Sequence, residues 1–189
     1  SLEELRIKAR RIEHFPAEIA DFTRFHLDQW QEGAAEPWIS PEVYDQAEPM
    51  TPVADLEGRA CWVGVDLSSV EDLTAVVAVF PADGEGEGRR YDVLPQFFLP
   101  EANIARKSEQ DRADYLRWKE AGFLTLTPGN VIDHSAIVAH VGELGQRYAV
   151  QEVAIDRWNS TAVTTALQEE GFSVNQFGQG FASMSAPVK

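Results

Sequence analysis

The chain has 189 residues, of which 44% are hydrophobic and 25% are charged, which suits one ordinary domain with an extension or two small units. Its formal net charge of -15 argues against a domain that grips DNA tightly by itself, although it allows an enzyme that receives DNA from a partner. A single cysteine, Cys61, excludes a disulfide framework and a cysteine-based zinc site, and it fits a reducing, intracellular setting. No stretch approaches the roughly 18 uncharged apolar residues of a membrane span, so we expect no membrane contact.

The N-terminal part predicts a helical lead-in followed by a linker. Apolar residues recur at helical spacing over residues 2–30, and Pro16 suits the first turn of a second helix. The stretch after it contains four prolines and few periodic apolar residues. We interpret it as a linker or an arm lying over a neighbour, with Trp38, Ile39 and Tyr44 as candidate anchors.

The pattern changes near Arg59, so we expect a lead-in over residues 1–58 and a compact domain over residues 59–189. Three apolar runs predict strands, and the connections between them are too short for a parallel crossover. They therefore indicate an antiparallel meander, with Pro95 marking an edge or a bulge in the third strand. The three strands are expected at residues 60–67, 73–80 and 91–99.

Helices and strands alternate after the meander. One helix is expected over residues 108–122, with Ser108 as its N-cap and Gly122 just past its end. A second helix follows with Asp133 as its N-cap, and a third ends at Gly171. The later elements are a strand at 123–129, a helix at 133–148, a strand at 149–156, a helix at 160–171 and a strand at 172–178. The whole predicts a mixed α/β sheet with flanking helices.

Two of the predicted strands end in an acid, Asp66 in the first and Asp156 in the later one. If these strands are parallel neighbours, both carboxylates reach the same end of the sheet, where ligands bind in open α/β sheets. We expect Asp66 at the tip of a buried strand, where a carboxylate is costly unless it is paired or holds a metal. Two adjacent carboxylates repel, so one takes a proton or a cation sits between them. Oxygen ligands suit Mg²⁺ or Mn²⁺, and two such ions support phosphodiester hydrolysis.

Three further residues are secondary candidates. Asp72 lies in the turn between the first two strands, and we interpret it as a turn acid that caps backbone N–H groups, with a metal contact as the alternative. Arg157 and Asn159 follow Asp156, and they could contact a phosphate or begin the next helix.

Other residue types give weaker signals. Ser68 and Ser69 have no histidine nearby in the sequence, which argues against a serine nucleophile. The histidines are interpreted as solvent-facing or packed side chains rather than metal ligands; they are His14, His26, His134 and His140.

Four separated motifs then carry a family resemblance. They read GVDLSSVEDLTAVVAVF, FFLPEANIARKSEQDRADYLRWKEAGFLTLTPGNVID, EVAIDRWNS and GQGFASMSAPVK, in this order. Together they closely resemble the nuclease half of a tailed-phage terminase large subunit, from about Trp62 to Lys189. The lead-in resembles the segment that joins the packaging ATPase to the nuclease in that family.

The resemblance implies an RNase H-like fold and a metal-dependent endonuclease that cuts concatemeric viral double-stranded DNA. It implies that Asp66 and Asp156 are metal ligands for two Mg²⁺ or Mn²⁺ ions. It also implies the terminase ATPase domain, the small terminase subunit and the portal protein as partners, in the cytoplasm of the bacterial host.

The sequence departs from the family pattern in two ways. It contains no Walker A glycine-lysine loop, and it shows no counterpart, up to Lys189, of the third acidic ligand that family members carry in a later helical region. Two carboxylates hold a metal weakly, so we expect low or no nuclease activity from this chain. The alternatives are another RNase H-like nuclease, such as a resolvase or transposase, and a non-catalytic docking module for the portal or a partner subunit.

Overall fold

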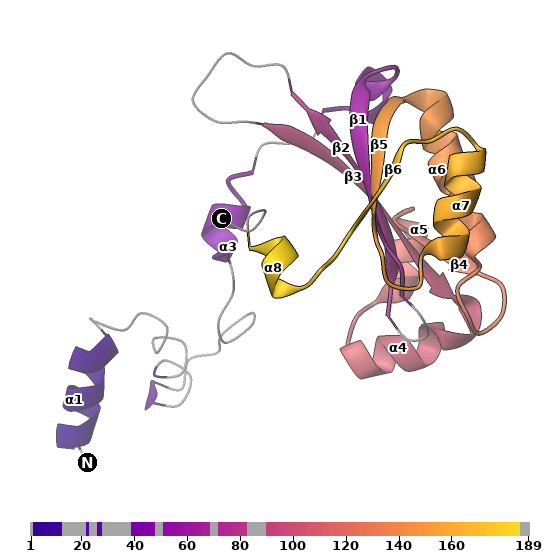
Figure 1. Ribbon diagram of the computed structural model, residues 1–189. Coiled ribbons are helices and arrows are strands. Elements are labelled where there is room, and N and C mark those ends of the chain that lie inside the picture. Colours follow the sequence, from indigo (N-terminus) through magenta and orange to yellow (C-terminus); the bar gives the residue numbers. More distant parts are fainter. Residues whose placement is uncertain are drawn as a thin grey trace. The chain divides into compact units, whose positions relative to one another are not determined.

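The computed structural model describes residues 2–12, 22, 26–27, 39–47, 51–68, 72–82 and 90–185 (Figure 1). The chain divides into two compact units, Ser1–Pro49 and Met50–Lys189. Within the described residues, no helix combines the length and the apolar character that crossing a bilayer requires.

The smaller unit contains α1 (Leu2–Ile12) and the short α3 (Pro41–Tyr44). The Nζ atom of Lys8 lies 3.1 Å from Nε2 of His26. Tyr44 is 72% exposed and Ile39 is also exposed, and their role as anchors on a neighbour stays a prediction. Pro16, Trp38 and His14 lie outside the described residues.

The larger unit is built on a mixed sheet with the strand order β4-β3-β2-β1-β5-β6. The first three strands pair antiparallel, and each later strand pairs parallel with its neighbour, which confirms the predicted meander followed by parallel strands. The strands are β1 (Ala60–Asp66), β2 (Thr74–Pro81), β3 (Tyr91–Pro100), β4 (Leu124–Thr127), β5 (Ala149–Asp156) and β6 (Val174–Phe177).

Helices α6 (His134–Arg147) and α7 (Thr161–Glu169) cover one face of this sheet, as Figure 1 shows. The main core lies between them and the strands, because alternate strand residues point toward the helices. Its largest fully buried side chains include Phe80, Ile137, Ile155 and Leu167. Asp133 caps α6 as predicted, since its carboxylate accepts a hydrogen bond from the Ser135 N–H at 2.9 Å.

The predicted single helix over 108–122 is wrong, because the chain forms two helices there: α4 (Ile104–Asp111) and α5 (Tyr115–Glu120). Arg112 ends α4 in the left-handed region, with φ 53°, so the helix cannot continue through it. The N-cap residue of α5 is Asp114, whereas the sequence predicted Ser108 as the N-cap of the single helix. The Asp114 carboxylate accepts a hydrogen bond from the Arg117 N–H at 3.1 Å. Gly122 follows α5 with φ 84°, as expected for a glycine just past a helix end.

On the sheet face opposite α6 and α7, Tyr115 of α5 packs with Leu99 and Leu124 at the end of β3 that pairs with β4. Elsewhere this face, which we call the open face, carries exposed apolar side chains. Trp62, Tyr91 and Val93 share this face and are 45%, 48% and 45% exposed. Pro95 also lies on it, in the part of β3 that precedes the pairing with β4. That part of β3 is a sheet edge, which is where proline is tolerated.

A β-bulge interrupts the pairing of β1 with β5. Cys61 pairs with Val150, but the next residue, Trp62, pairs with Glu152, so Gln151 has no partner on β1. Downstream of the bulge the register continues to the pair of Val65 with Ile155.

The larger unit also includes residues that the sequence placed in the lead-in. Leu56, in the 3-10 turn Val53–Leu56, is fully buried in the main core. The backbone N–H of Thr51 donates to Asp92 on β3 at 2.9 Å. The boundary between the units therefore lies near residue 50 rather than 58.

Candidate functional site

Asp66 and Asp156 end two adjacent parallel strands, β1 and β5. Their strands stay in register up to Val65 and Ile155, so the two acids occupy the next position on each strand. Val65 and Ile155 point into the core, and both acids therefore lie on the open face. The structure thus brings together the two residues that the sequence proposed, at what we call the carboxyl edge: the ends of β1, β5 and β6.

Asp66 itself is exposed, which corrects the expectation of a carboxylate at a buried strand tip. The apolar run that suggested burial is buried only on the side that faces α6 and α7. Asp66 points the other way, so the energetic cost of burial does not apply to it. Its accessible carboxylate remains available to a ligand from solvent.

The loop after β5 is held close to Asp156. The Trp158 N–H donates to Oδ1 of Asp156 at 3.3 Å, and Trp158 is 80% exposed beside it. Asn159 is exposed and adopts φ 55°, so it forms the loop and does not start the helix. Ser160, fully buried, precedes α7, and its Oγ accepts from the Gln176 carboxamide at 3.3 Å.

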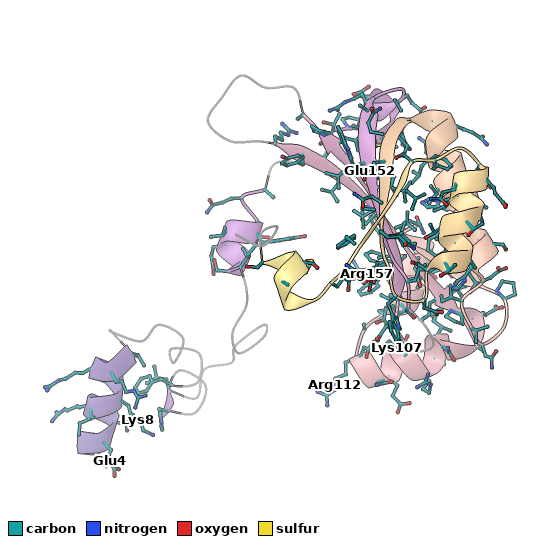
Figure 2. All side chains as sticks on the ribbon, viewed as in Figure 1. Glu4, Lys8, Lys107, Arg112, Glu152 and Arg157 are labelled. Carbon is teal, nitrogen blue, oxygen red and sulfur yellow. The ribbon has the colours of Figure 1, made fainter. Side chains whose placement is uncertain are left out.

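Arg157 packs against the chain that leaves β6. Its backbone N–H donates to the Phe177 carbonyl at 3.0 Å, and its guanidinium lies so close to Gly178 that a Cβ there would be 2.8 Å from Nη2. Figure 2 shows Arg157 and Lys107 toward the α4 end of the sheet, with Glu152 farther from it. Arg157 is exposed at this edge, which keeps its predicted phosphate contact available.

Gln179 is a site residue that the sequence reasoning missed. Its Nε2 donates to Oδ1 of Asp66 at 3.3 Å, although 113 residues separate the two in the chain. The GQG motif that contains it was a sign of the family and gave no indication of this contact.

Asp72 forms an ion pair with Lys107 of α4, while the turn residues that it was expected to cap, 69–71, lie outside the described residues. Its carboxylate lies 3.2 Å from Nζ of Lys107, a buried side chain on α4 that also lies 3.1 Å from Asp111. The hydrogen bond with Asp111 is the largest of the interactions that raise the pKa of Lys107. The side chain of Asp72 is 85% exposed, and its described partner is this lysine.

Among the histidines, His140 is packed as expected. Its ring contacts Phe98 edge-on with a centroid distance of 5.6 Å, and burial lowers the pKa of its imidazole. His134 is the first residue of α6, next to the cap residue Asp133.

The carboxyl edge fits a hard divalent cation by its donor chemistry. Asp66 and Asp156 offer accessible carboxylate oxygens, and Mg²⁺ is commonly held by one or two carboxylates together with water and substrate phosphate. No cluster of three or more histidine, cysteine or acidic side chains suited to a metal occurs within the described part of the chain. Among the described residues, a cation here would therefore have two carboxylates as its acidic ligands.

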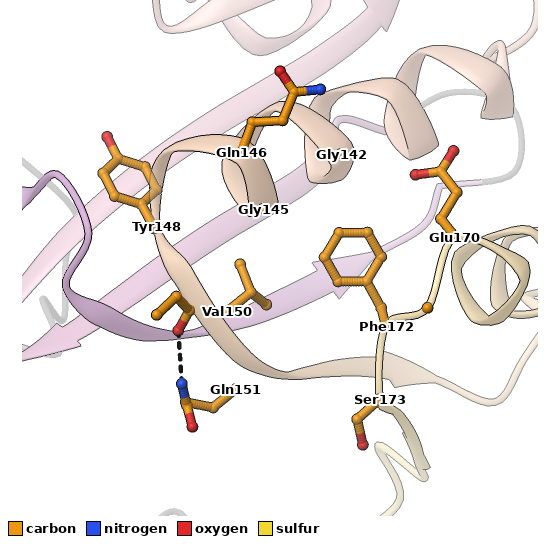
Figure 3. A pocket seen from close by; sticks show the side chains of 11 residues that line it. Gly142, Gly145, Gln146, Tyr148, Val150, Gln151, Glu170, Phe172 and Ser173 are labelled. Atoms are coloured by element: carbon orange, nitrogen blue, oxygen red, sulfur yellow. Dashed lines mark hydrogen bonds between the residues drawn. The ribbon is translucent and has the colours of Figure 1, made fainter.

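A cavity of about 680 Å³ lies at the other end of β5, near its first residues. Figure 3 shows Phe172 close to the α6 turns that carry Gly142 and Gly145. The lining has a single carboxylate, that of Glu170, and so cannot bring two acids together. The cavity is separate from the carboxyl edge.

Residues 2–189 match the family described as "Terminase large subunit, endonuclease domain". The chain belongs to this family. Along its whole length it is 30% identical to "Terminase, large subunit" of Enterobacteria phage HK97, covering 36% of that protein. It is 26% identical over 137 residues to "Protein YmfN" of Escherichia coli K12, which is 70% of this chain and 30% of that protein.

Comparison with a solved structure also shows the terminase nuclease fold. The crystal structure of the HK97 bacteriophage large terminase matches all of this chain with a TM-score of 0.68 and 29% identity, and 38% of that chain is covered. The mixed sheet described above is therefore the RNase H-like sheet of a terminase nuclease domain. This terminase domain spans about a third of the length of the curated relatives it matches.

Proposed function

We propose that this domain is a metal-dependent endonuclease that cuts concatemeric double-stranded DNA by two-metal phosphodiester hydrolysis, with Mg²⁺ or Mn²⁺ bound at Asp66 and Asp156. The single observation that supports it is the placement of both acids on one face, at the ends of adjacent parallel strands. The family membership supports the same reading.

In this proposal Asp66 is the ligand shared by both cations and Asp156 is a ligand of one. When bound, the cations would activate a water molecule and stabilise the leaving oxygen of the phosphodiester. Arg157 is exposed beside Asp156 and would hold a DNA phosphate near the acids. Two carboxylates compensate the charge of the cations only in part, so we propose weak activity for this chain.

The biological setting is part of the proposal. The domain would act in the cytoplasm of the bacterial host, on DNA delivered by a terminase ATPase domain, with the small terminase subunit and the portal protein as further partners. Delivery by a partner suits an acidic chain, because its net charge of -15 opposes unaided DNA binding.

Plasmid cleavage with Mn²⁺ tests the proposed function. We expect slow cutting by the wild-type chain, which Asp66→Asn and Asp156→Asn both abolish. Glu152→Gln is the matched control, because Glu152 lies on the same strand and face as Asp156, roughly 13 Å away at about 3.3 Å per residue. Equal cutting by the wild type and the three variants would contradict the proposal, and so would cutting without a divalent cation. Robust cutting by the wild-type chain would contradict the proposed weak activity.

A docking module for a partner protein is the second candidate. The exposure of Trp62, Tyr91 and Val93 on one sheet face favours it, since apolar side chains gathered on a surface suit protein contacts. Thermal unfolding separates the two functions: if Mn²⁺ leaves the melting temperature of both the wild type and Asp66→Asn unchanged, the docking function is favoured.

A further inference from the structure

This inference rests on the proposed cation site and concerns the segment Gly178–Gln179–Gly180, which we call the strap. The strap follows β6 at the carboxyl edge, and Gln179 at its centre is exposed. Its Nε2 donates to Oδ1 of Asp66 at 3.3 Å. A neutral side chain therefore contacts the carboxylate that the proposal makes the shared ligand.

The strap is held at both of its ends. At the first end, the Arg157 N–H donates to the Phe177 carbonyl at 3.0 Å, and the Arg157 guanidinium packs on Gly178. At the other end, the Gly180 carbonyl accepts from the backbone N–H groups of Ser183 and Met184, both at 3.0 Å, where α8 (Phe181–Met184) begins. These contacts place Gln179 between Arg157, which follows Asp156, and the side chain of Asp66.

A glutamine carboxamide offers a donor on one side and an acceptor on the other. An ionised carboxylate only accepts hydrogen bonds, so the NH₂ group faces Asp66 in the protein without a cation. Positive charge at the carboxylates reverses this preference, because it repels the NH₂ group and attracts the carbonyl oxygen. Glutamine carbonyls are established ligands for hard divalent cations.

We propose that Gln179 is a further residue of the divalent-cation site, which orients Asp66 before binding and presents its carboxamide oxygen to the bound cation. A turn about the terminal side-chain torsion exchanges the two groups, and this torsion is soft. The strap needs no other movement, since Gln179 already lies against Asp66.

Titration of Mn²⁺ itself tests the proposal, with free Mn²⁺ measured by electron paramagnetic resonance. We expect Gln179→Ala to weaken Mn²⁺ binding by about tenfold, as the loss of a supporting partner does at other metal sites. We expect Gln179→Glu to tighten it by about tenfold, because it adds a carboxylate at the site. Gln151→Glu is the matched control, since it adds the same charge at the far end of β5 and should change binding less than about twofold.

The outcomes separate this inference from the proposed function. Unchanged Mn²⁺ binding in both Gln179 variants, with binding lost in Asp66→Asn, would overturn the role of Gln179 and keep the metal site. Tighter binding in Gln179→Glu and Gln151→Glu alike would show a general effect of charge and would also overturn it. If no variant and no wild-type protein binds Mn²⁺, both proposals fail. Far-UV circular dichroism checks that each variant is folded.

Discussion

Asp92 on β3 accepts two hydrogen bonds from Thr51, one from the backbone N–H at 2.9 Å and one from Oγ1 at 2.8 Å. Asp92 is only 2% exposed, and the guanidinium of Arg59 lies 3.5 Å from the carboxylate. The Thr51 backbone hydrogen bond is the main cause that holds the pKa of Asp92 below its usual range. The segment before β1 is therefore tied to the sheet by a buried ionised carboxylate.

The stability of the larger unit should depend on this carboxylate in acid. Because the pKa of Asp92 is lowered in the folded state, its contribution is full above the unfolded value of about 3.9 and is lost as the pH falls through the folded value. We expect Asp92→Asn to lower the free energy of unfolding by about 1–3 kcal/mol at pH 7 and by less near pH 3. Urea unfolding at both pH values measures this.

The exposed acid Asp55 provides the control for that experiment, because it lies in the same segment before β1. Asp55→Asn should change the free energy of unfolding by less than about 0.5 kcal/mol at either pH. A difference between wild type and Asp92→Asn that stays constant with pH would contradict the role of Asp92.

Substitution by alanine at two glycines of α6, Gly142 and Gly145, should change the free energy of unfolding differently. A Cβ on Gly145 would lie 2.7 Å from the Phe172 ring, so Gly145→Ala must displace a packed ring and should destabilise by about 1–3 kcal/mol. A Cβ on Gly142 would lie 3.1 Å from a carboxylate oxygen of Glu170, a flexible side chain that can move away. Gly142→Ala should therefore be neutral or stabilising by up to about 1 kcal/mol, through helix propensity.

Thermal and urea unfolding of the two alanine variants measure this contrast. Gly145→Ala combined with Phe172→Leu supplies the second check, because a smaller side chain should relieve the overlap and recover part of the loss. Equal effects of Gly142→Ala and Gly145→Ala would mean that the Phe172 ring moves freely.

The buried Lys107 should stabilise the fold through its two acidic partners. It lies 3.1 Å from Asp111 and 3.2 Å from Asp72, and Lys107→Ala removes the cation from both. We expect a loss of about 1–3 kcal/mol in the free energy of unfolding. The exposed Lys119 on α5 is the control, and Lys119→Ala should change it by less than about 0.5 kcal/mol. Equal losses in the two variants would contradict the prediction.

Trp158 should report DNA binding at the carboxyl edge. Its side chain is 80% exposed and its backbone donates to Asp156, so DNA at the acids would shield the indole from water. We expect a change in tryptophan emission when double-stranded DNA is added in Ca²⁺, and Trp158→Phe should remove most of it. Trp62→Phe, near the start of β1, should keep the change. A signal that survives Trp158→Phe would place the DNA elsewhere.

The strands were predictable because apolar runs bounded by turns mark them well. β5 matches its predicted range of 149–156, β1 ends one residue earlier than predicted, and β2 is shifted by one residue toward the C-terminus at both ends. The break between α4 and α5 was not predictable from a glycine or proline, since Arg112 adopts the left-handed conformation instead. The cap residue Asp114 was the available signal for the second helix start.

For the candidate site, strand order was enough to bring Asp66 and Asp156 together. The exposure of Asp66 was missed because an apolar run shows that a strand is buried, but not on which of its faces. The contact of Gln179 with Asp66 joins residues 113 positions apart, and its neutral side chain carries no charge pattern that points to a partner. Such contacts depend on the path of the strap, which only the folded structure shows.

The bulge at Gln151 shifts the alternation of side chains between the two faces of β5 by one residue. With strict alternation, Val150 and Asp156 would point to the same face, because an even number of positions separates them. The extra residue lets Val150 pack against the core with Val153, while Asp156 still reaches the open face. Because of the inserted Gln151, the strand can begin with Val150 packed on the core and end with Asp156 facing solvent.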